Sequence, residues 1–550
     1  MPWLRWSIGT SMTESKRERA FRGLGVSGGV AIGPIHILNE TTAARRSFTT
    51  VEEEARSFRE AVAAAASQLE ALIASQDKLA GEILEFQLAL LDDEDMLAPV
   101  FRSIEGGTPW DEAWSAMLGR EIAEYAQSGG GTLAARAGDL ADLQGRVLRA
   151  PHGAASLRET IPPGSILVAA DLTPSIFVDL YWEAIAGAAT LGGSPVSHVS
   201  ILARARGINF MVGLNAKLDE IGQGDEAILD AAQGLLTLHP GSRTLAAANV
   251  RIDLEREDRS EMEALLPRPA ATAGGEPVKI MVNIDEPGRL DALSPDHCDG
   301  VGLTRTEFLF TAGHLPGEDE QLAFYRRLIA WAAGRPVTIR TLDAGGDKPI
   351  AGVTVDGEAN PFLGVRGLRL SFARPEIFRV QLRALARAAA DAPLNVMFPM
   401  VTVPAEFAEA RHMMLAEIAD LERAGVDCAV PRMGIMVEVP AAALTAADFD
   451  ADFYSIGSND LIQYATACAR DNSSLAPLAD PTNPAVMELI RRTVEAARRR
   501  GVEVSLCGDM ASSPQLIGAL LDTGLRTLSC APAQIGPIKL AVSRYAPKAA

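Results

Sequence analysis

The stretch RMGIMVEVPAAALTAADFDADFYSIGSND (residues 432–460) contains the unit that decides the fold of the C-terminal half. A short apolar run is followed by an alanine-rich segment of helical pattern and then by a second apolar run. Similar runs recur on both sides: VKIMVNI (278), GVGLTRTEFLF (300), PVTIRTLD (336), NVMFPMV (395), EVSLCGD (503) and TLSCAP (527). Eight strand–helix alternations over roughly 270 residues are typical of a (β/α)8 barrel. We therefore predict a TIM-type barrel over residues 275–550.

The polar residues that end these runs are candidates for chemistry, because active sites of such barrels lie at the carboxyl ends of the strands. They are Asn283, Asp285, Arg305, Arg340, Asp343, Glu438, Asn459, Asp460 and Cys507. Two arginines suit bidentate binding of a phosphate and a carboxylate. Two carboxylates, Glu438 and Asp460, suit a Mg2+ ion that completes its octahedron with substrate oxygens. The pattern favours a small phosphorylated acid bound with Mg2+; the alternatives are strand-end capping and, for Cys507, a small buried residue.

Upstream of the barrel, the sequence alternates between strand-like and helical patterns. GVSGGVAIGPIHIL (25–38) and GSILVAADL (164–172) indicate short strands, whereas VEEEARSFREAVAAAASQLEALIAS (51–75) has helical spacing. We predict a multidomain α/β protein whose N-terminal α/β domain contains an inserted helical subdomain. The predicted parts are a tail (1–21), the α/β domain (22–40 and 149–240), the helical insertion (41–148) and a linker helix (241–274).

The segment LGGSPVSHVSILARARGINFMVGL (191–214) is the sharpest feature of the N-terminal half. The glycine pair favours a tight turn, and the small polar residues after it lead into an amphipathic helix. His198 then lies near a helix N-terminus, where backbone N–H groups stabilise an anion. A histidine in this position can act as the nucleophile that accepts a phosphoryl group. The alternative is a helix-capping or core histidine.

Charge and cysteine usage exclude several classes of protein. The chain has 51 Lys and Arg against 71 Asp and Glu, a formal net charge of −20, which disfavours nucleic acid and favours a basic protein partner. There is no run of 18 apolar residues and no export signal, so we predict no membrane insertion. The five cysteines form no CxxC pair, which is typical of reduced thiols in a cytoplasmic protein.

At this point the motifs resemble a known family. GGSPVSHVSILAR resembles the phosphohistidine segment of phosphoenolpyruvate-utilising enzymes. The barrel motifs, in order, resemble those of enzyme I of the bacterial sugar phosphotransferase system (PTS): GVGLTRTEFLF, IRTLDAGGDK, NPFLGVRGLR, MFPMV, GIMVEVPAA, SIGSNDLIQY and CGDMA. The resemblance implies a phosphotransferase that binds phosphoenolpyruvate and Mg2+ in the barrel. The resemblance also implies that this enzyme passes the phosphoryl group through a mobile histidine domain to the phosphocarrier protein HPr.

The resemblance also implies individual roles. His198 would carry the phosphoryl group, Thr173 would hydrogen-bond that histidine, and Cys507 would protonate carbon 3 of the enolate. The implied phosphate and carboxylate contacts are Arg305, Arg340, Asn459, Asp460 and Arg470, with Arg366 as a further residue on the phosphate side. Glu438 and Asp460 would be the metal ligands.

The expected partners follow from the same resemblance. HPr would dock on the helical insertion, where the acidic residues 92–95 lie beside Leu90, Leu91 and Met96, and the barrel would form a homodimer. A solvated helix end is the alternative for the acidic stretch. Alternative functions are a nitrogen-type PTS enzyme I that charges a regulatory carrier and a non-catalytic regulator that senses phosphoenolpyruvate. A dikinase is disfavoured because the chain before His198 is too short for a nucleotide-binding domain.

Overall fold

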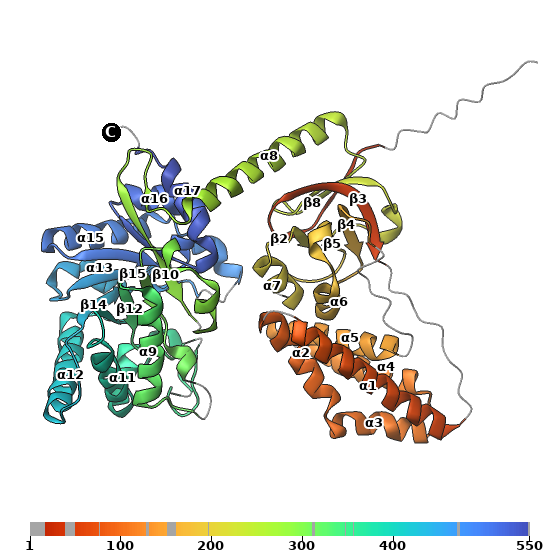
Figure 1. The fold of residues 1–550 in the computed structure, drawn as a ribbon, viewed down its shortest axis with the longest axis horizontal. Helices are drawn as coiled ribbons and strands as arrows, with labels where there is room; N and C mark the ends of the chain where they lie inside the picture. Colours follow the sequence, from red (N-terminus) through yellow and green to blue (C-terminus); the bar gives the residue numbers. More distant parts are fainter. Residues whose placement is uncertain are drawn as a thin grey trace, which may run out of the picture. The chain divides into compact units, whose positions relative to one another are not determined.

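The computed structural model divides the chain into two compact units, Met1–Arg256 and Glu257–Ala550 (Figure 1). It describes residues 17–38, 50–75, 78–127, 131–150, 161–195, 197–285, 287–310, 314–346, 348–355, 357–469 and 473–547. The boundary between the units falls inside the long helix α8 (Ser242–Leu265), in the segment for which the sequence predicts a linker helix.

The first unit contains an eight-stranded sheet with the order β1-β8-β7-β3-β4-β5-β6-β2. Its central strands β3 to β6 are parallel neighbours, whereas β3 and β7 pair antiparallel. The strands are β1 (Arg19–Arg22), β2 (Leu24–Ser27), β3 (Val30–Leu38), β4 (Ser165–Ala169), β5 (Ile185–Thr190), β6 (Phe210–Val212), β7 (Glu226–Asp230) and β8 (Leu235–Leu238). Two short helices, α6 (Pro174–Asp179) and α7 (His198–Ala205), follow β4 and β5.

The end of the N-terminal tail differs from the prediction. Arg19–Arg22 pairs antiparallel with β8, so the last residues of the predicted tail (1–21) belong to the sheet. Phe21, which is buried, anchors this edge strand in the core. Residues 1–16, and residues 39–49 before the first helix, lie outside the described residues.

In the described part of the chain between β3 and β4, five α-helices follow one another. They are α1 (Val51–Ser75), α2 (Lys78–Leu91), α3 (Glu94–Glu105), α4 (Trp110–Gln127) and α5 (Gly131–Arg149). Phe58 packs against both Trp110 and Trp114 in their core, which also includes Leu202 of α7. Asp142 of α5 accepts a hydrogen bond from the backbone N–H of Ser175 in α6 at 2.8 Å. The helical insertion therefore contacts the α/β domain through α5 and α6.

The second unit is a closed barrel, because β10 pairs with both β11 and β17 and every neighbouring pair is parallel. Its strands are β10 (Pro277–Ile284), β11 (Val301–Thr304), β12 (Val337–Arg340), β13 (Leu394–Phe398), β14 (Arg432–Val437), β15 (Phe453–Gly457), β16 (Glu503–Cys507) and β17 (Thr527–Cys530). All eight apolar runs form these strands, which confirms the predicted fold class. The short β9 (Ala270–Ala271) adds an antiparallel partner to β10.

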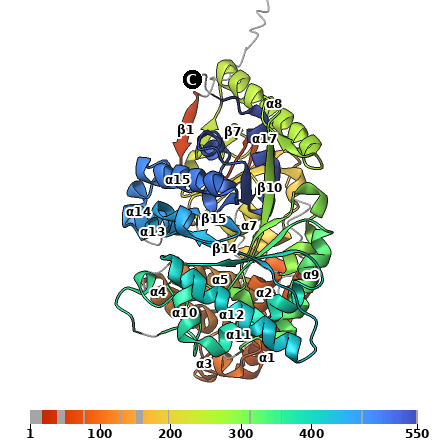
Figure 2. The ribbon, with the colours of Figure 1, turned by 90° about the vertical axis from the view of Figure 1, so that its left-hand side faces the viewer.

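Helices surround these strands (Figure 2). They are α9 (Glu318–Ala332), α10 (Leu368–Ala373), α11 (Pro375–Ala388), α12 (Pro404–Arg423), α13 (Pro440–Leu444), α14 (Ser458–Thr466), α15 (Pro484–Arg500), α16 (Ile517–Asp522) and α17 (Ile535–Arg544). None of the helices in the described part of the chain is long and apolar enough to span a bilayer.

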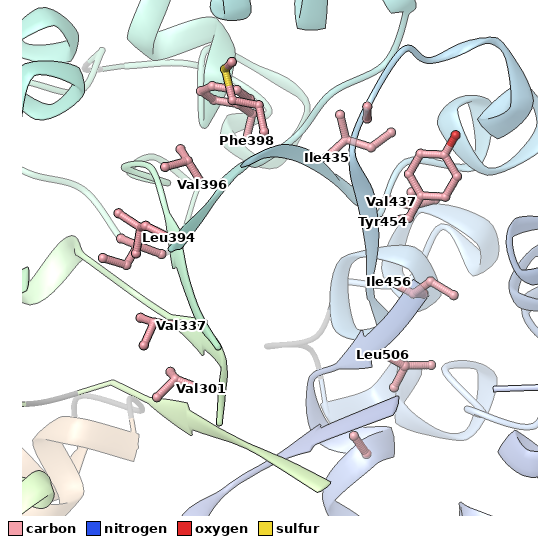
Figure 3. Close-up of a cluster of buried hydrophobic side chains, with 14 of the residues drawn as sticks. Val301, Val337, Leu394, Val396, Phe398, Ile435, Val437, Tyr454, Ile456 and Leu506 are labelled. Carbon is pink, nitrogen blue, oxygen red and sulfur yellow. The ribbon is translucent and has the colours of Figure 1, made fainter. Parts of the chain in front are cut away.

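The strand alternation decides which side chains reach the barrel interior. Val396, Tyr454, Ile456 and Leu506 lie on the outer side of the ring of strands (Figure 3), in the core shared with the helices. Because successive side chains of a strand point to opposite faces, their neighbours point inward. Cys507, next to Leu506, belongs to a separate inner cluster. The last residues of the strands thus place their side chains around the carboxyl end of the barrel.

Candidate functional site

His198 is the first residue of α7, as the sequence predicts. Ser197 caps the helix by accepting a hydrogen bond from the backbone N–H of Ser200, and Gly193, at φ +88°, turns the chain before it. The positive φ at Gly193 is a conformation that glycine adopts without strain. The imidazole is partly exposed, with 30% of its side-chain surface accessible.

Asp139 of α5 holds the imidazole of His198 in place. Its Oδ1 lies 2.8 Å from Nδ1 of His198, and its side chain is buried, with 4% accessible. The hydrogen bond to this carboxylate raises the pKa of His198, while partial burial opposes the shift. A carboxylate at Nδ1 favours a proton on that nitrogen, so the neutral ring presents its lone pair at Nε2. Nε2 is therefore the nitrogen available as a nucleophile.

Thr173 does not make the hydrogen bond to His198 that the resemblance implies. Its hydroxyl is buried without a hydrogen-bond partner, and its backbone forms the N-cap position of α6. Asp139 takes the expected place of Thr173 at the imidazole because α5 brings a buried carboxylate to the start of α7.

At the carboxyl end of the barrel, a small pocket collects most of the predicted barrel residues. Its lining residues come from the ends of β11, β12, β14, β15 and β16 and from the loops that follow. They are Leu303, Arg305, Arg340, Asp343, Lys348, Met436, Glu438, Gly457, Ser458, Asn459, Asp460, Cys507 and Gly508. The structure therefore brings Arg305, Arg340, Glu438, Asn459, Asp460 and Cys507 together.

Arg340 is the more rigidly held of the two pocket arginines. It is 4% exposed, and its guanidinium is 2.9 Å from both Oε1 of Glu307 and Oδ2 of Asp343. Burial opposes the charged form, but Glu307 and Asp343 outweigh it and raise the pKa of Arg340. Arg305 is more accessible and pairs with Asp285 at 3.3 Å. The pocket thus has one fixed and one accessible guanidinium.

Arg366, which the resemblance places on the phosphate side, lies too deep to line the pocket. It is 2% exposed and is absent from the pocket lining. Its guanidinium donates to both oxygens of Asp343, to Oδ1 of Asp460 at 3.1 Å and to the hydroxyl of Tyr464. The hydrogen bonds that its guanidinium donates position the carboxylates that face the pocket.

Glu438 is a buried carboxylate of the pocket whose pKa is strongly raised. It is 1% exposed, and its Oε1 accepts a hydrogen bond of 2.6 Å from the backbone N–H of Met400. Burial and the neighbouring charges of Asp460 and Asp343 raise the pKa of Glu438 to about 8, against the opposite effect of Arg340 and Arg366. A cation beside this carboxylate would therefore be favourable.

Cys507 and Asn459 complete the pocket on β16 and α14. Cys507 is 1% exposed, and burial raises the pKa of its thiol, so the thiol keeps its proton near neutral pH. Asn459 is fixed by Asp509, which accepts from its amide at 3.1 Å and donates its own backbone N–H at 2.9 Å.

Some of the residues at these two sites could not have been chosen from the sequence. Glu307 and Lys348 follow the motif residues Arg305 and Asp343, but nothing in their spacing shows that they face Arg340 or the pocket. Asp139 lies in the helical insertion, 59 residues before His198, with no local signal. Arg470 lies outside the described residues.

Comparisons with known proteins cover both units of the chain. Three family models match: "PEP-utilising enzyme, N-terminal" over residues 22–136, "PEP-utilising enzyme, mobile domain" over 161–234 and "PEP-utilising enzyme, PEP-binding domain" over 259–546. A solution structure described as Enzyme I (nEIt) is 25% identical over 43% of this chain and 99% of that chain, with a TM-score of 0.36.

Two curated relatives are similar over nearly the whole chain. Phosphoenolpyruvate-protein phosphotransferases of Bacillus sp. (strain S) and of Geobacillus stearothermophilus are each 35% identical to it, over 97% of this chain and 95% of theirs. The chain therefore belongs to the phosphoenolpyruvate-protein phosphotransferase family of phosphoenolpyruvate-utilising enzymes.

Proposed function

We propose that this enzyme transfers the phosphoryl group of phosphoenolpyruvate to Nε2 of His198 and then to a histidine of HPr, releasing pyruvate, as the first step of PTS sugar uptake. The observation that carries the assignment of His198 is its contact with the buried carboxylate of Asp139. That contact leaves Nε2 unprotonated in the neutral ring, as an attacking nitrogen requires. The helix N-terminus beside it stabilises the negative charge of the phosphoryl group.

In the barrel, the two arginines bind the substrate phosphate. Arg340 is preorganised by Glu307 and Asp343 and so provides a fixed positive charge for the charge that develops during transfer. Arg305, which is more accessible than Arg340, binds the same phosphate group from the open side of the pocket. Asn459 and Arg470 bind the remaining phosphate and carboxylate oxygens.

Cys507 is the general acid for the enolate that remains after transfer. Its buried thiol is protonated near neutral pH and lines the pocket. A thiol in that state can give its proton to carbon 3 and so form the methyl group of pyruvate.

The donor set of the pocket fits Mg2+. Glu438 and Asp460 supply carboxylate oxygens, and Gly457 leaves room there, since a Cβ atom at that position would lie 2.8 Å from Oε2 of Glu438. A Mg2+ ion held by two protein carboxylates would complete its octahedron with substrate oxygens. When bound, the ion supplies positive charge that neutralises the phosphate and the enolate oxygen. Glu438 and Asp460 hold it, and Arg366 orients Asp460.

The helical insertion offers a surface for HPr. A hollow of about 370 Å³ is lined mainly by apolar residues, with three acidic residues, Asp93, Asp95 and Glu121, and one basic residue, Arg120. Of the predicted surface, Leu90 and Met96 line it, whereas Leu91 is 3% exposed and belongs to the core. Asp93 both lines the hollow and caps α3. An apolar hollow with an acidic rim suits a basic partner face. The predicted homodimer through the barrel stays a prediction.

The phosphoenzyme tests the proposal directly. Wild-type chain mixed with phosphoenolpyruvate and Mg2+ should gain one acid-labile phosphoryl group, located by peptide mapping at His198, and lose it when HPr is added. His198→Ala should gain none, because the nucleophile is absent, whereas His36→Ala should behave as wild type. Phosphorylation of the His198→Ala chain would refute the assignment, and a stable adduct that HPr does not remove would refute the carrier.

Arg340→Ala should separate the two half-reactions. Phosphorylation by phosphoenolpyruvate should fall by about 100-fold or more, because a preorganised positive charge is lost from the transferring group. Phosphorylation of the same variant by phosphorylated HPr should persist, since that step uses His198 alone. The matched control is Arg335→Ala, an arginine of the barrel unit that pairs with Asp296. Equal loss of both reactions in Arg340→Ala would indicate a folding defect instead.

Asp139→Asn should change the pH dependence of stability. The carboxylate raises the pKa of His198, so the stability from the pair is fully present below the unfolded pKa of about 6.5 and is lost as pH rises through the folded pKa. The deficit of the variant in unfolding free energy should therefore be larger at about pH 5.5 than at about pH 9. Urea unfolding, with the exposed Asp219→Asn as control, measures this deficit. A deficit that grows with pH would contradict the pairing.

A further inference from the structure

The barrel contains a second cavity, at the amino-terminal end of its strands, away from the pocket described above. It has a volume of about 280 Å³ and is lined by the first residues of several strands, including Lys279, Arg432, Phe453 and Glu503. Lys279, Arg432 and Glu503 are joined by ion pairs, and about half of each side chain is exposed. The cavity therefore opens to solvent between charged side chains.

Ser505 is one of the lining residues that point from this cavity toward the centre of the barrel. It lies two positions before Cys507 on β16, so the two side chains share the inner face of the strand. Leu506 between them points outward into the core (Figure 3). On the next strand, Ser455 lies opposite Ser505, between the outward-facing Tyr454 and Ile456.

Hydrogen bonds connect these three side chains into a chain. The hydroxyl of Ser505 donates to that of Ser455 at 3.1 Å, and the hydroxyl of Ser455 donates to Sγ of Cys507 at 3.5 Å. The thiol donates to the backbone carbonyl of Ile456 at 3.5 Å. Ser455 is 1% exposed, so its hydroxyl does not exchange protons directly with bulk solvent. Because both hydroxyls can rotate, the series can be oriented with each hydroxyl donating toward the sulfur.

We propose that Ser505 and Ser455 form a proton relay that reprotonates Cys507 from the amino-terminal cavity. This rests on the proposed role of Cys507 as the acid. In the forward step the S–H bond breaks and a C–H bond forms at carbon 3, leaving a thiolate and pyruvate. The thiolate then takes the proton of Ser455, Ser455 takes that of Ser505, and Ser505 takes one from a solvent acid in the cavity, hydronium or a buffer acid. The relay returns a proton to Cys507 from the amino-terminal end of the barrel while the carboxyl-end pocket is occupied.

An isotope experiment on the full chain separates the relay from the phosphoryl chemistry. The enzyme is incubated in D2O with Mg2+, phosphoenolpyruvate and carbon-13-labelled pyruvate, without a carrier protein. Carbon label enters phosphoenolpyruvate at each reversal of transfer, and this can occur with the same proton passing back and forth between Cys507 and carbon 3. Deuterium enters carbon 3 only when the sulfur exchanges its proton with solvent. Mass spectrometry gives the ratio of deuterium gained to carbon exchanged.

The ratio should fall by about tenfold or more in Ser455→Ala and in Ser505→Ala, because a proton-transfer path is removed. Ser505→Thr, which keeps the hydroxyl, should restore it. The matched control is Ser529→Ala, another buried barrel hydroxyl that donates to Asn283 and not to Cys507; its ratio should equal that of wild type. A merely structural role would lower both exchanges together and leave the ratio unchanged.

Two outcomes would overturn the relay. An unchanged ratio in Ser455→Ala, with carbon exchange at the wild-type rate, would mean that Cys507 exchanges its proton through the carboxyl-end pocket. A fall of equal size in Ser529→Ala would mean that the effect is not specific to the series. Cys507→Ala separates the relay from the function on which it rests. If carbon exchange persists at the wild-type rate in that variant, the role of Cys507 as the acid is wrong; if carbon exchange is lost, that role stands and the serine variants test the relay alone.

Discussion

The requirement that most constrains the barrel is the neutralisation of charges buried at its carboxyl end. Asp343 and Glu438 are each 1% exposed, and Arg340, Arg366 and Asp460 are nearly as buried. Charges in such a setting are tolerated only when each is paired and hydrogen-bonded. Arg340 and Arg366 both contact Asp343, and they hold the pKa of Asp343 at about 2 in spite of its burial. This arrangement ties the end of β12 to the start of α14.

The carboxylates are not fully compensated on the Glu438 side. Glu438 receives one backbone hydrogen bond, and its raised pKa reflects burial and repulsion from its neighbours. A cation would compensate the negative charge of Glu438, and an anionic ligand bound with it would balance the added positive charge. The same positions cost stability in the free chain and provide preorganised charge for catalysis, which is the usual relation between burial and function at such sites.

The sequence predicted the features that depend on local pattern. Apolar runs with polar ends identified all eight barrel strands, because the two-residue alternation and the helical spacing between them are local properties. The grouping of Arg305, Glu438 and Cys507 followed from the rule that the carboxyl ends of parallel strands meet. Sequence alone could not give contacts that depend on tertiary approach. Asp139 reaches His198 only because the tertiary fold brings the side chain of a residue in α5 to the first residue of α7. Arg366 is unavailable to a ligand because Asp343, Asp460 and Tyr464 accept its hydrogen bonds.

The central claim is that the barrel pocket binds an anion and a divalent cation together. Calorimetric titration of the His198→Ala chain with phosphoenolpyruvate tests this claim most directly. In this variant binding is separated from phosphorylation. The account predicts saturable binding at one site per chain with Mg2+, much weaker binding without it, and a reduced Mg2+ dependence in a chain that also carries Glu438→Gln. Absence of binding to the folded chain in the presence of Mg2+, or affinity that does not depend on Mg2+, would contradict it.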